Sequence, residues 1–394
     1  MKKDIQALEL ENGAPLFTLD EITKAFKALV NAKVKNKRRS TAFRDFDLFY
    51  NPRKFSLLPI GLDGQTTIHV YATEETKEKF LWEIYRLLND FEKERTQTPR
   101  FAFKKFKTVE YETKPGKLRK MSIPCLRDQV VVRCILNRLN QIGIVDAENK
   151  PNQNIPAITA KIKGLIHSNP KRQIIRTDIK DFYPSVNTEK LLTFLEASHG
   201  AQIGSRLMDL IRKALVDNKS AGSYTGLPLG MGTSVLLANY YISHLGLSHF
   251  YEGVNVIRYE DDLIMFLDEG VDAEDVKKKL DEKLTEFGLT RNEDKTEVLS
   301  CMAPFIFLGV SYDNGNVSVT EERMKKWKED VKSDIHNEII NYRTLELINP
   351  NAVIPKRKEI VDMIWKQHQR GKRSYFHQHY LKIKAINENS YTGS

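Results

Sequence analysis

The stretch that most constrains the fold of this chain is residues 254–267. It reads VNVIRYEDDLIMFL, so an acidic turn sequence, Tyr259-Glu260-Asp261-Asp262, separates two apolar runs. Short apolar runs bounded in this way are typical of buried strands, and the sequence predicts a β-hairpin whose tight turn carries the carboxylates. Adjacent carboxylates such as Asp261 and Asp262 repel each other there unless a cation lies between them. An ordinary hairpin turn, in which Asp is common, explains this stretch by itself equally well.

A third carboxylate stands in a similar context in residues 172–186. The segment reads RQIIRTDIKDFYPSV, where Ile174 and Ile175 predict the end of a strand and Asp178 follows at its exit. A strand that ends there beside the hairpin would bring Asp178 next to Asp261. Carboxylates so placed can bind two metal ions for in-line phosphoryl transfer, and Mg²⁺ suits them because it prefers oxygen ligands and leaves room for phosphates. The alternative is a surface loop, where most strings of the type Asp-x-x-Asp-Phe-Tyr occur.

Six motifs in a defined order make the chain resemble the reverse transcriptase family. They are KPGKLRKMSIPCLRDQVVVRCIL at 114–136, DIKDFY at 178–183, GLPLGMGTSVLLANYY at 226–241, YEDD at 259–262, LTRNEDKTEVLS with Asn292, Lys295 and Thr296, and FLGVSY at 307–312. The resemblance covers about residues 114–320. Any one motif would be weak evidence, whereas six in the right order are hard to obtain by chance.

The resemblance implies an α+β fold, a right-hand polymerase with three parts. These are fingers, a palm made of a small antiparallel sheet backed by helices, and a helical thumb. We expect an N-terminal extension and the fingers in residues 1–170, and the palm in residues 171–318 with helices inserted around 186–225. Residues 319–394 are expected to form a basic helical thumb.

The same resemblance implies an RNA-directed DNA polymerase that joins dNTPs to a primer 3′-hydroxyl by two-metal-ion nucleotidyl transfer. It makes Asp178, Asp261 and Asp262 the metal ligands, with help from the backbone carbonyl of Ile179. Two Mg²⁺ ions, or Mn²⁺ in their place, are the implied cofactors. Lys295 is the predicted general acid toward the pyrophosphate leaving group or its positive partner. A surface lysine is the alternative.

The residues that the resemblance assigns to nucleotide binding come from three of the motifs: Lys117, Arg119, Asp181, Phe182, Tyr183, Leu229 and Gly230. Lys117 and Arg119 belong to a fingertip that covers the triphosphate, with an ordinary basic hairpin as the alternative. Tyr183 stands where reverse transcriptases exclude a 2′-hydroxyl, so it favours DNA synthesis over RNA synthesis. A tyrosine of the core is the alternative at that position.

Three residues resemble the primer grip, the hairpin that holds the primer terminus: Phe307, Leu308 and Gly309. The following Asp313-Asn314-Gly315 predicts a tight turn. Two positions depart from the family pattern. Leu229 stands where many relatives carry Gln, so an amide that often contacts the nucleotide is lost. Glu260 stands where relatives commonly carry a small or apolar residue, so it adds a carboxylate near the metals or the primer end.

The chain is basic, because its 394 residues carry a net charge of +10 and the pI is about 9.2. This suits polyanionic partners, and we expect an RNA template or non-coding RNA, the DNA product and dNTPs. A partner protein or an oligomer is left open. No stretch approaches the roughly 20 apolar residues of a membrane span, so we expect a cytoplasmic protein without membrane contact. Cys125, Cys134 and Cys301 show no disulfide or metal spacing and are predicted to be reduced core residues.

Local patterns predict several further elements. Apolar spacing predicts helices in three places before the palm: 21–34 with Asp20 as its cap, 73–93 and 127–143. Alternating Phe and Lys residues predict a strand within 100–112. Helices with basic and aromatic residues are expected after Thr320, and Trp365 among them is assigned to core packing.

The length of the chain favours a bacterial single-module enzyme, because it leaves no room for an RNase H, protease or integrase domain. Retron enzymes usually carry Val-Thr-Gly near the thumb, whereas Val319-Thr320 is followed here by Glu321. Group II intron enzymes are usually longer. The antiphage-defence group is therefore favoured, with a non-coding RNA as partner or template. Two alternatives stay open, a template-independent or protein-primed DNA polymerase and a non-catalytic RNA-binding scaffold of polymerase shape.

Overall fold

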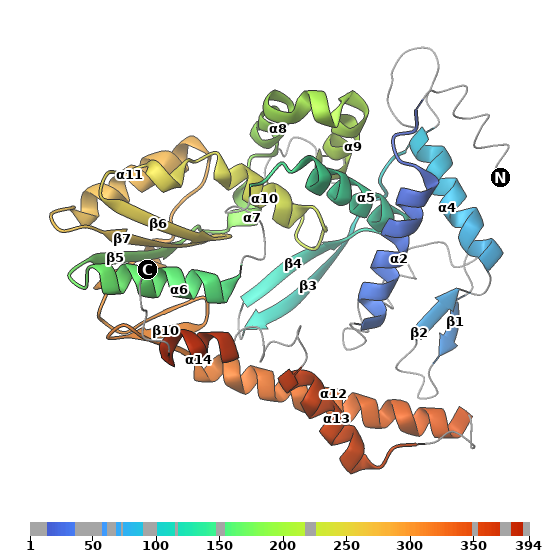
Figure 1. Ribbon diagram of the computed structural model, residues 1–394. Coiled ribbons are helices and arrows are strands. Elements are labelled where there is room, and N and C mark those ends of the chain that lie inside the picture. The colour runs from blue at the N-terminus through green and yellow to red at the C-terminus, as the bar shows by residue number, and fades with distance from the viewer. Residues whose placement is uncertain are drawn as a thin grey trace. The chain divides into compact units, whose positions relative to one another are not determined.

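The computed structural model describes most of the chain: residues 14–35, 57–60, 68–71, 74–89, 101–114, 117–146, 154–216, 226–348, 354–370 and 380–388. Helices and small antiparallel sheets make up these residues, so the predicted α+β class is confirmed (Figure 1). The chain forms two compact units, each built from two stretches. Unit 1 comprises Met1–Lys150 and Asp181–His244, and unit 2 comprises Pro151–Lys180 and Leu245–Ser394. The expected limits of fingers, palm and thumb stay a prediction.

Unit 1 combines helices with two short antiparallel hairpins, β1 with β2 and β3 with β4. Its strands are β1 (Leu57–Ile60), β2 (Ile68–Tyr71), β3 (Lys107–Lys114) and β4 (Lys117–Ile123). Its described helices are α2 (Leu19–Lys35), α4 (Glu74–Asn89), α5 (Leu126–Ile142), α7 (Phe182–Ser185), α8 (Thr188–Ile203), α9 (Ser205–Val216) and α10 (Ser234–Ser243). The three helices predicted before the palm correspond to α2, α4 and α5 and are confirmed.

The start of α2 differs from the prediction, because Thr18 caps the helix and Asp20 does not. The Glu21 backbone N–H donates to Thr18 Oγ1 (3.2 Å), and the Thr18 N–H donates to Glu21 Oε2 (2.8 Å). This reciprocal pair is a capping box, which needs a Ser or Thr three residues before a Glu or Gln. Asp20 instead forms an ion pair with Lys24 one turn later (2.6 Å).

The strand predicted within 100–112 begins only at Lys107. Ahead of it, the Lys104 backbone N–H donates to a carboxylate oxygen of Asp128 (2.8 Å). Asp128 is fully buried in the first turn of α5, where it also pairs with Arg127 (2.7 Å). The amide of Lys104 is therefore satisfied by a side chain and not by a strand neighbour. The alternating Phe and Lys residues here belong to an irregular segment anchored on a helix.

Unit 2 contains a four-stranded antiparallel sheet in the order β6-β7-β5-β8 and a three-stranded sheet in the order β11-β10-β9. The strands of the larger sheet are β5 (Gln173–Asp178), β6 (Val254–Tyr259), β7 (Asp262–Leu267) and β8 (Glu297–Ser300). Those of the smaller sheet are β9 (Phe305–Phe307), β10 (Val310–Asp313) and β11 (Asn316–Val319). The predicted hairpin and the strand that ends at Asp178 are both confirmed.

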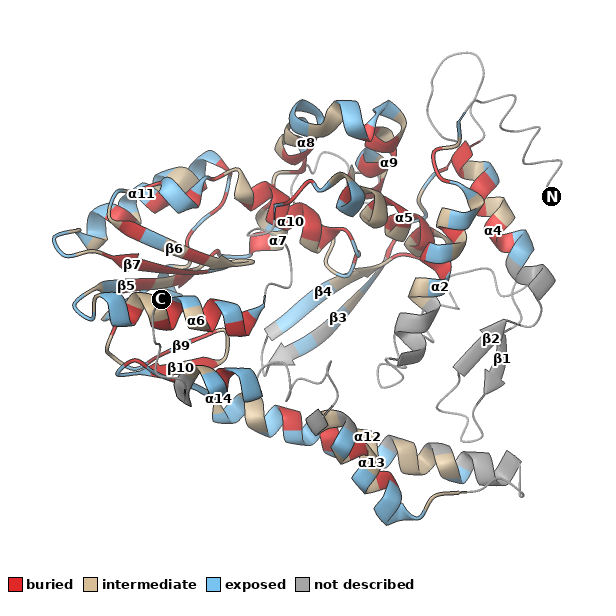
Figure 2. Ribbon diagram, viewed as in Figure 1, coloured by how far each residue is buried: buried red, intermediate tan, exposed pale blue. Residues whose placement is uncertain are grey.

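Two layers cover the two faces of the larger sheet (Figure 1). On one face, α6 (Ile155–Ser168) and the three-stranded sheet share a core with Ile174, Ile264 and Phe266. These residues lie on one face because side chains alternate along a strand. On the other side runs α11 (Ala273–Glu286), and Figure 2 shows β5 and β7 buried between the layers. The predicted small antiparallel sheet backed by helices is confirmed.

The C-terminal helices α12 (Glu321–Ile348) and α13 (Arg357–Arg370) pack on each other through a separate apolar cluster. The rings of Trp327 and Trp365 meet edge to face in this cluster, with centroids 5.7 Å apart. Trp327 is buried and Trp365 is partly buried. The prediction that Trp365 serves helix packing is confirmed.

The last described helix, α14 (Leu381–Glu388), belongs to the sheet core and not to the α12–α13 pair. Its Ile383 is buried in the same cluster as α6 and the two sheets. The buried Lys163 ammonium on α6 donates to the Ile386 carbonyl oxygen (2.9 Å). A cation suits this position because carbonyl groups at the C-terminal end of a helix carry partial negative charge.

The three cysteines are free and buried, as predicted. Burial raises the pKa of the Cys125 thiol to about 11 and that of Cys134 to about 12. Both thiols are therefore protonated and unreactive at neutral pH. Among the helices of the described residues, none combines the length and the apolar character needed to cross a bilayer.

Candidate active site

The hairpin around the acidic turn sequence closes with a two-residue turn. Tyr259 at the end of β6 pairs with Asp262 at the start of β7, so Glu260 and Asp261 form the turn. Glu260 has a left-handed backbone with φ of 54°, which costs a residue other than glycine about 1–2 kcal/mol. Arg258 Nη1 donates to the Glu260 carbonyl oxygen (3.2 Å) and helps to hold this conformation. Glu260 and Asp261 in the turn and Asp262 directly after it therefore place three carboxylates at one end of this hairpin.

Strand register brings Asp178 to this turn. β5 and β7 pair so that Asp178 lies directly opposite Asp262. The Ile179 N–H donates to the Asp261 carbonyl oxygen (3.1 Å), which extends the pairing past the end of β5. Residues directly opposite each other point to the same face of a sheet. The prediction that Asp178 reaches the turn is confirmed, although its cross-strand partner is Asp262 and not Asp261.

Burial and mutual repulsion disfavour the ionised carboxylates of this cluster. Burial, followed by the charges of Asp261 and Asp178, raises the pKa of Asp262 to about 6, and Lys295 opposes this shift. Burial and then Asp261 also raise the pKa of Glu260. A bound cation would oppose these shifts, because an opposite charge favours the ionised form.

Lys295 supplies positive charge to the cluster. It ends the short 3₁₀ turn η3 (Glu293–Lys295), and its ammonium forms an ion pair with Asp178 Oδ2. The Asp178 side chain is 13% exposed and that of Lys295 is 55% exposed. The Asn292 N–H donates to the Asp178 carbonyl oxygen (2.9 Å). The predicted Asn and Lys of the fourth motif therefore lie against the end of β5.

The cluster has the oxygen ligands that suit a divalent cation, although it needs further ligands to hold one. In the part of the chain that the structure describes, no group of three His, Cys, Asp or Glu side chains could hold a metal ion by itself. Mg²⁺ is usually held by one or two carboxylates, with waters and substrate phosphates as the other ligands. Asp178 Oδ1 is buried and has no hydrogen-bond partner among the described residues. A buried oxygen of this kind, beside a second carboxylate, is suited to a cation.

The second group of predicted site residues lies in unit 1. Asp181 is exposed, with a left-handed backbone (φ 45°), directly before α7. The Phe182 side chain is 2% exposed, which indicates packing, whereas Tyr183 is partly exposed. The Leu227 N–H donates to the Tyr183 carbonyl oxygen (2.8 Å). The backbone of the first motif is therefore bonded to the glycine-bearing loop of the second.

The same loop contacts strand β4. The Ser122 N–H donates to the Leu229 carbonyl oxygen (2.6 Å). Gly230 has φ of 94°, and a Cβ there would lie only 2.9 Å from the Ser122 carbonyl oxygen. Glycine is required because it alone tolerates both conditions. Leu229 and Gly230 thus lie against the strand that carries the exposed Arg119, while the side chain of Lys117 is outside what the structure describes.

The predicted primer grip is the tight hairpin between β9 and β10. Leu308 and Gly309 both have positive φ, 51° and 68°, as a type I′ turn requires. A Cβ at Gly309 would collide with the side chain of Arg323 on α12. The Thr320 N–H donates to the Gly309 carbonyl oxygen (3.3 Å), which ties the turn to the start of that helix. Phe307 is buried, so the core fixes one side of the hairpin.

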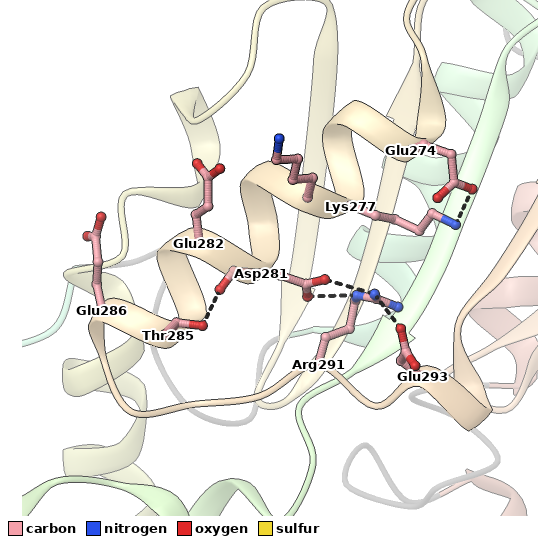
Figure 3. A pocket seen from close by; sticks show the side chains of 9 residues that line it. Glu274, Lys277, Asp281, Glu282, Thr285, Glu286, Arg291 and Glu293 are labelled. Atoms are coloured by element: carbon pink, nitrogen blue, oxygen red, sulfur yellow. Dashed lines mark hydrogen bonds and ion pairs between the residues drawn. The ribbon is translucent and has the colours of Figure 1, made fainter.

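Sequence reasoning missed Arg291, which lies beside the acidic edge. It is 8% exposed, and it pairs with Asp281 of α11 (2.9 Å; Figure 3). Its Nη1 donates to Thr296 Oγ1 (2.9 Å), and Thr296 shares a hydrogen bond with Thr177 (2.8 Å). In the sequence, Arg291 is marked only by its charge and its place directly before Asn292. Its partner Asp281 lies on α11, earlier in the chain.

One family model matches the sequence. It is described as "Reverse transcriptase (RNA-dependent DNA polymerase)" and matches residues 104–312, more than half of the chain. A search of curated proteins finds no match.

Similar solved structures include telomerases of two yeasts. Telomerase from Candida tropicalis with the TWJ fragment of telomeric RNA is 14% identical with a TM-score of 0.46, over 82% of this chain and 60% of the other. The apo enzyme of Candida tropicalis is 14% identical with a TM-score of 0.41, over 67% of this chain and 56% of the other. Candida albicans telomerase with the same RNA fragment is 11% identical with a TM-score of 0.40, over 68% and 52%. The chain thus spans little more than half the length of these structures, and likeness at this level says nothing of activity or partners.

Proposed function

This chain belongs to the reverse transcriptase family, and on that premise we propose that it is an RNA-directed DNA polymerase. It joins dNTPs to a primer 3′-hydroxyl at the end of the sheet where strand β5 ends and strand β7 begins. The observation that carries the proposal is the cross-strand pair of the partly buried Asp178 and the exposed Asp262, which lie beside the turn that holds Asp261. Carboxylates in this arrangement need a cation to offset their repulsion. In phosphoryl transfer the substrate phosphates bind Mg²⁺, so the nucleotide brings a cation to the carboxylates.

We assign metal binding to Asp178, Asp261 and Asp262, with the backbone carbonyl of Ile179 as a further ligand. The buried Oδ1 of Asp178 and the raised pKa of Asp262 support this assignment. Two Mg²⁺ ions, or Mn²⁺ in their place, would neutralise the triphosphate and make the primer hydroxyl a better nucleophile.

Lys295 is proposed to act on the leaving group. Its ammonium forms an ion pair with Asp178, and more than half of its side chain is exposed to solvent. It can therefore serve the departing pyrophosphate as a positive partner or as a general acid. The hydrogen bond from the Asn292 N–H to Asp178 keeps the lysine's segment against the strand end.

The nucleotide and primer roles are proposals that follow from the family. Lys117 and Arg119 would bind the triphosphate, with Arg119 exposed on β4. Tyr183, which is partly exposed, would exclude the 2′-hydroxyl of a ribonucleotide. Further contacts are assigned to Asp181, Phe182, Leu229 and Gly230 for the nucleotide, and to Phe307, Leu308 and Gly309 for the primer terminus.

The test is DNA synthesis by the purified protein with its co-purified RNA. Mg²⁺ and each dNTP, singly and together, are supplied to the parent, to an Asp261→Asn, Asp262→Asn double variant, and to Asp268→Asn as a control. Asp268 directly follows β7 at the far end of the sheet. We expect product from the parent and the control only. Absence of product from the parent, with RNA still bound, would instead favour the non-catalytic RNA-binding scaffold or a missing partner protein.

The pattern of dNTP consumption sorts the finer proposals. We propose a cytoplasmic enzyme of antiphage defence that uses a non-coding RNA as partner or template. In that case the product requires the dNTPs that the RNA sequence dictates. Incorporation of one dNTP without the others, or product attached to the protein, would favour the template-independent or protein-primed alternative.

A further inference from the structure

Arg291 is held more firmly than a surface arginine needs to be. Its side chain is 7% exposed, and its Nε and Nη2 donate to the two carboxylate oxygens of Asp281, both at 2.9 Å. Nη2 also pairs with Glu293 (3.3 Å), so Arg291 lies between α11 and η3 (Figure 3). Two parallel hydrogen bonds fix the plane of the guanidinium as well as its position.

The hydrogen bonds of Arg291 lead to the strand end that carries Asp178. Arg291 Nη1 donates to Thr296 Oγ1 (2.9 Å), and that hydroxyl shares a hydrogen bond of 2.8 Å with Thr177. Thr177 is the residue before Asp178. Three side-chain contacts, each within hydrogen-bond distance, therefore connect Asp281 to Thr177, whose backbone continues into Asp178.

The backbone follows the same path. Arg291 and Ile179 form an isolated antiparallel bridge. On either side of it, the Lys180 N–H donates to the Thr290 carbonyl oxygen (2.8 Å), and the Asn292 N–H donates to that of Asp178 (2.9 Å). The segment that leads to Lys295 is therefore fastened along the exit of β5 over several residues.

Stability by itself rarely explains a buried arginine. Removing its charge from water costs several kcal/mol, and a well-packed apolar residue often stabilises a fold as well. What an arginine with two fixed oxygens adds is orientation. Orientation matters for Lys295, because its long exposed side chain has many rotamers and its backbone must be fixed for the ammonium to meet Asp178.

We infer that Arg291, clamped by Asp281, is a positioning residue that holds the segment of Lys295 against Asp178 for nucleotide transfer. The inference rests on the proposed polymerase function. Arg291 acts through Lys295 and the backbone of Asp178. It therefore affects the rate of the chemical step more than the binding of dNTP.

The test compares Arg291→Met, Lys295→Met and the double variant in single-nucleotide incorporation on a defined primer and template. The matched control is Arg172→Met, because Arg172 pairs with Asp268 at the opposite end of the same sheet (2.7 Å) with its side chain 13% exposed. Arg291→Lys and Asp281→Asn keep the test valid if the Met variant folds poorly, since both weaken the clamp without an apolar substitution.

We expect Arg291→Met to lower kcat by roughly tenfold or more, with KM for the dNTP within about threefold. The double variant should match Lys295→Met within about twofold, because residues that act through one another are not additive. Arg172→Met should leave kcat unchanged below its unfolding temperature. Multiplicative losses in the double variant, or a loss in KM alone, would overturn the inference, as would an unaffected Lys295→Met.

Amide hydrogen exchange gives a readout that does not need activity. The Asn292 and Lys180 amides should exchange at least about tenfold faster in Arg291→Met and Asp281→Asn than in the parent or in Arg172→Met. Unchanged exchange at these amides would show that Arg291 does not hold the segment. If the parent makes no DNA, the polymerase proposal fails, and the exchange rates still decide whether Arg291 anchors this strand end.

Discussion

The two ends of the four-stranded sheet carry the same kind of ion pair in different surroundings. Where β5 begins, Arg172 pairs with Asp268, and beyond its other end, Arg291 pairs with Asp281. The arginine side chains are 13% and 7% exposed, and both aspartates are 43% exposed. The pairs are thus matched in chemistry and in burial, and they differ in what they hold in place.

Arg172 fastens one helix to one strand end. Besides Asp268, it donates to the Leu165 carbonyl oxygen (2.9 Å) and to the Ser168 hydroxyl (2.8 Å), both near the end of α6. These bonds join α6 to the chain that leaves β7. The role of this pair is explained by the packing of the two layers alone.

Arg291 is linked through Thr296 and Thr177 to the strand end where neighbouring carboxylates destabilise each other. Burial and neighbouring charges raise the pKa of both Asp262 and Glu260, and Glu260 has a left-handed backbone. Strain and repulsion of this kind persist only where the surrounding structure enforces them, and they occur most often at functional sites. The comparison teaches that the same kind of ion pair can have two roles. At one end of the sheet it holds packed layers together, and at the other it holds the backbone beside carboxylates that repel each other.

The sharpest way to break the comparison is to neutralise one aspartate at each end. Asp178→Asn should lower primer extension by at least about a thousandfold, because a predicted metal ligand is lost. Asp268→Asn should keep activity within about threefold. Primer extension with Mg²⁺ checks both variants, and comparable losses would mean that the two ends do not differ in function.

The next effect is on stability and depends on pH. The pKa of Asp262 rises from its ordinary 3.8 to about 6 in the fold, so the folded protein binds more protons than the unfolded chain between these values. Stability is therefore lost as the pH rises through that interval. The loss stays well below the about 3 kcal/mol that the full shift would give, because Asp262 is exposed and water screens its charge. Asn cannot ionise, so Asp262→Asn should be the more stable protein at pH 7.5 in EDTA, and the difference should fade near pH 4.

Urea unfolding at the two pH values measures this difference. Mg²⁺ with dNTP should stabilise the parent at pH 7.5 and leave Asp262→Asn nearly unchanged, because ligands stabilise the state that binds them. Equal stability of parent and variant in EDTA at both pH values would contradict the electrostatic account of this end.

A smaller loss is expected at the packing end. Arg172→Met leaves Asp268 without its partner and removes two hydrogen bonds to α6, which should lower the free energy of unfolding by about 2 kcal/mol. The half-exposed Asp268 keeps access to water, so the loss stays below that of a fully buried pair. Thermal unfolding checks this, and a loss of nucleotide incorporation without a loss of stability would contradict a packing role.

The smallest effect concerns the turn itself. Glycine adopts the left-handed conformation of Glu260 without strain, so Glu260→Gly should stabilise the protein by about 1 kcal/mol. Glu260→Ala is the matched control, because it removes the carboxylate and keeps a Cβ. Chemical unfolding of both variants separates strain from charge, and equal gains would assign the whole effect to the carboxylate.

Elements whose signal lies within a few residues could be predicted from the sequence. The tight turn expected at Asp313-Asn314-Gly315 is confirmed, because Asn314 and Gly315 have the positive φ values, 48° and 74°, that such a turn needs. The two strands around the acidic turn sequence are confirmed for the same reason. The wrong cap of α2 was also a local matter, since the reciprocal bonds of Thr18 and Glu21 follow a recognisable spacing.

Elements that depend on a distant partner could not be predicted. The Phe and Lys alternation before Lys107 looked like a strand, but the buried Asp128 on α5 takes the amide that a strand would use. Arg291 looked like one more charge in a basic chain. Its partner Asp281 is on a helix that only the fold brings beside it.

The sequence by itself determined that Asp178 stands at the end of a strand and that Asp261 and Asp262 lie at a hairpin turn. It also determined the family, because hydrophobic periodicity, turn residues and motif order are properties of neighbouring residues. The tertiary structure decided which carboxylates meet. Asp178 is paired with Asp262 by strand register, and Lys295 is held against Asp178 by the clamp of Arg291 and Asp281. Register and ion pairs arise from the packing of segments that are far apart in the chain, and no local pattern encodes that packing.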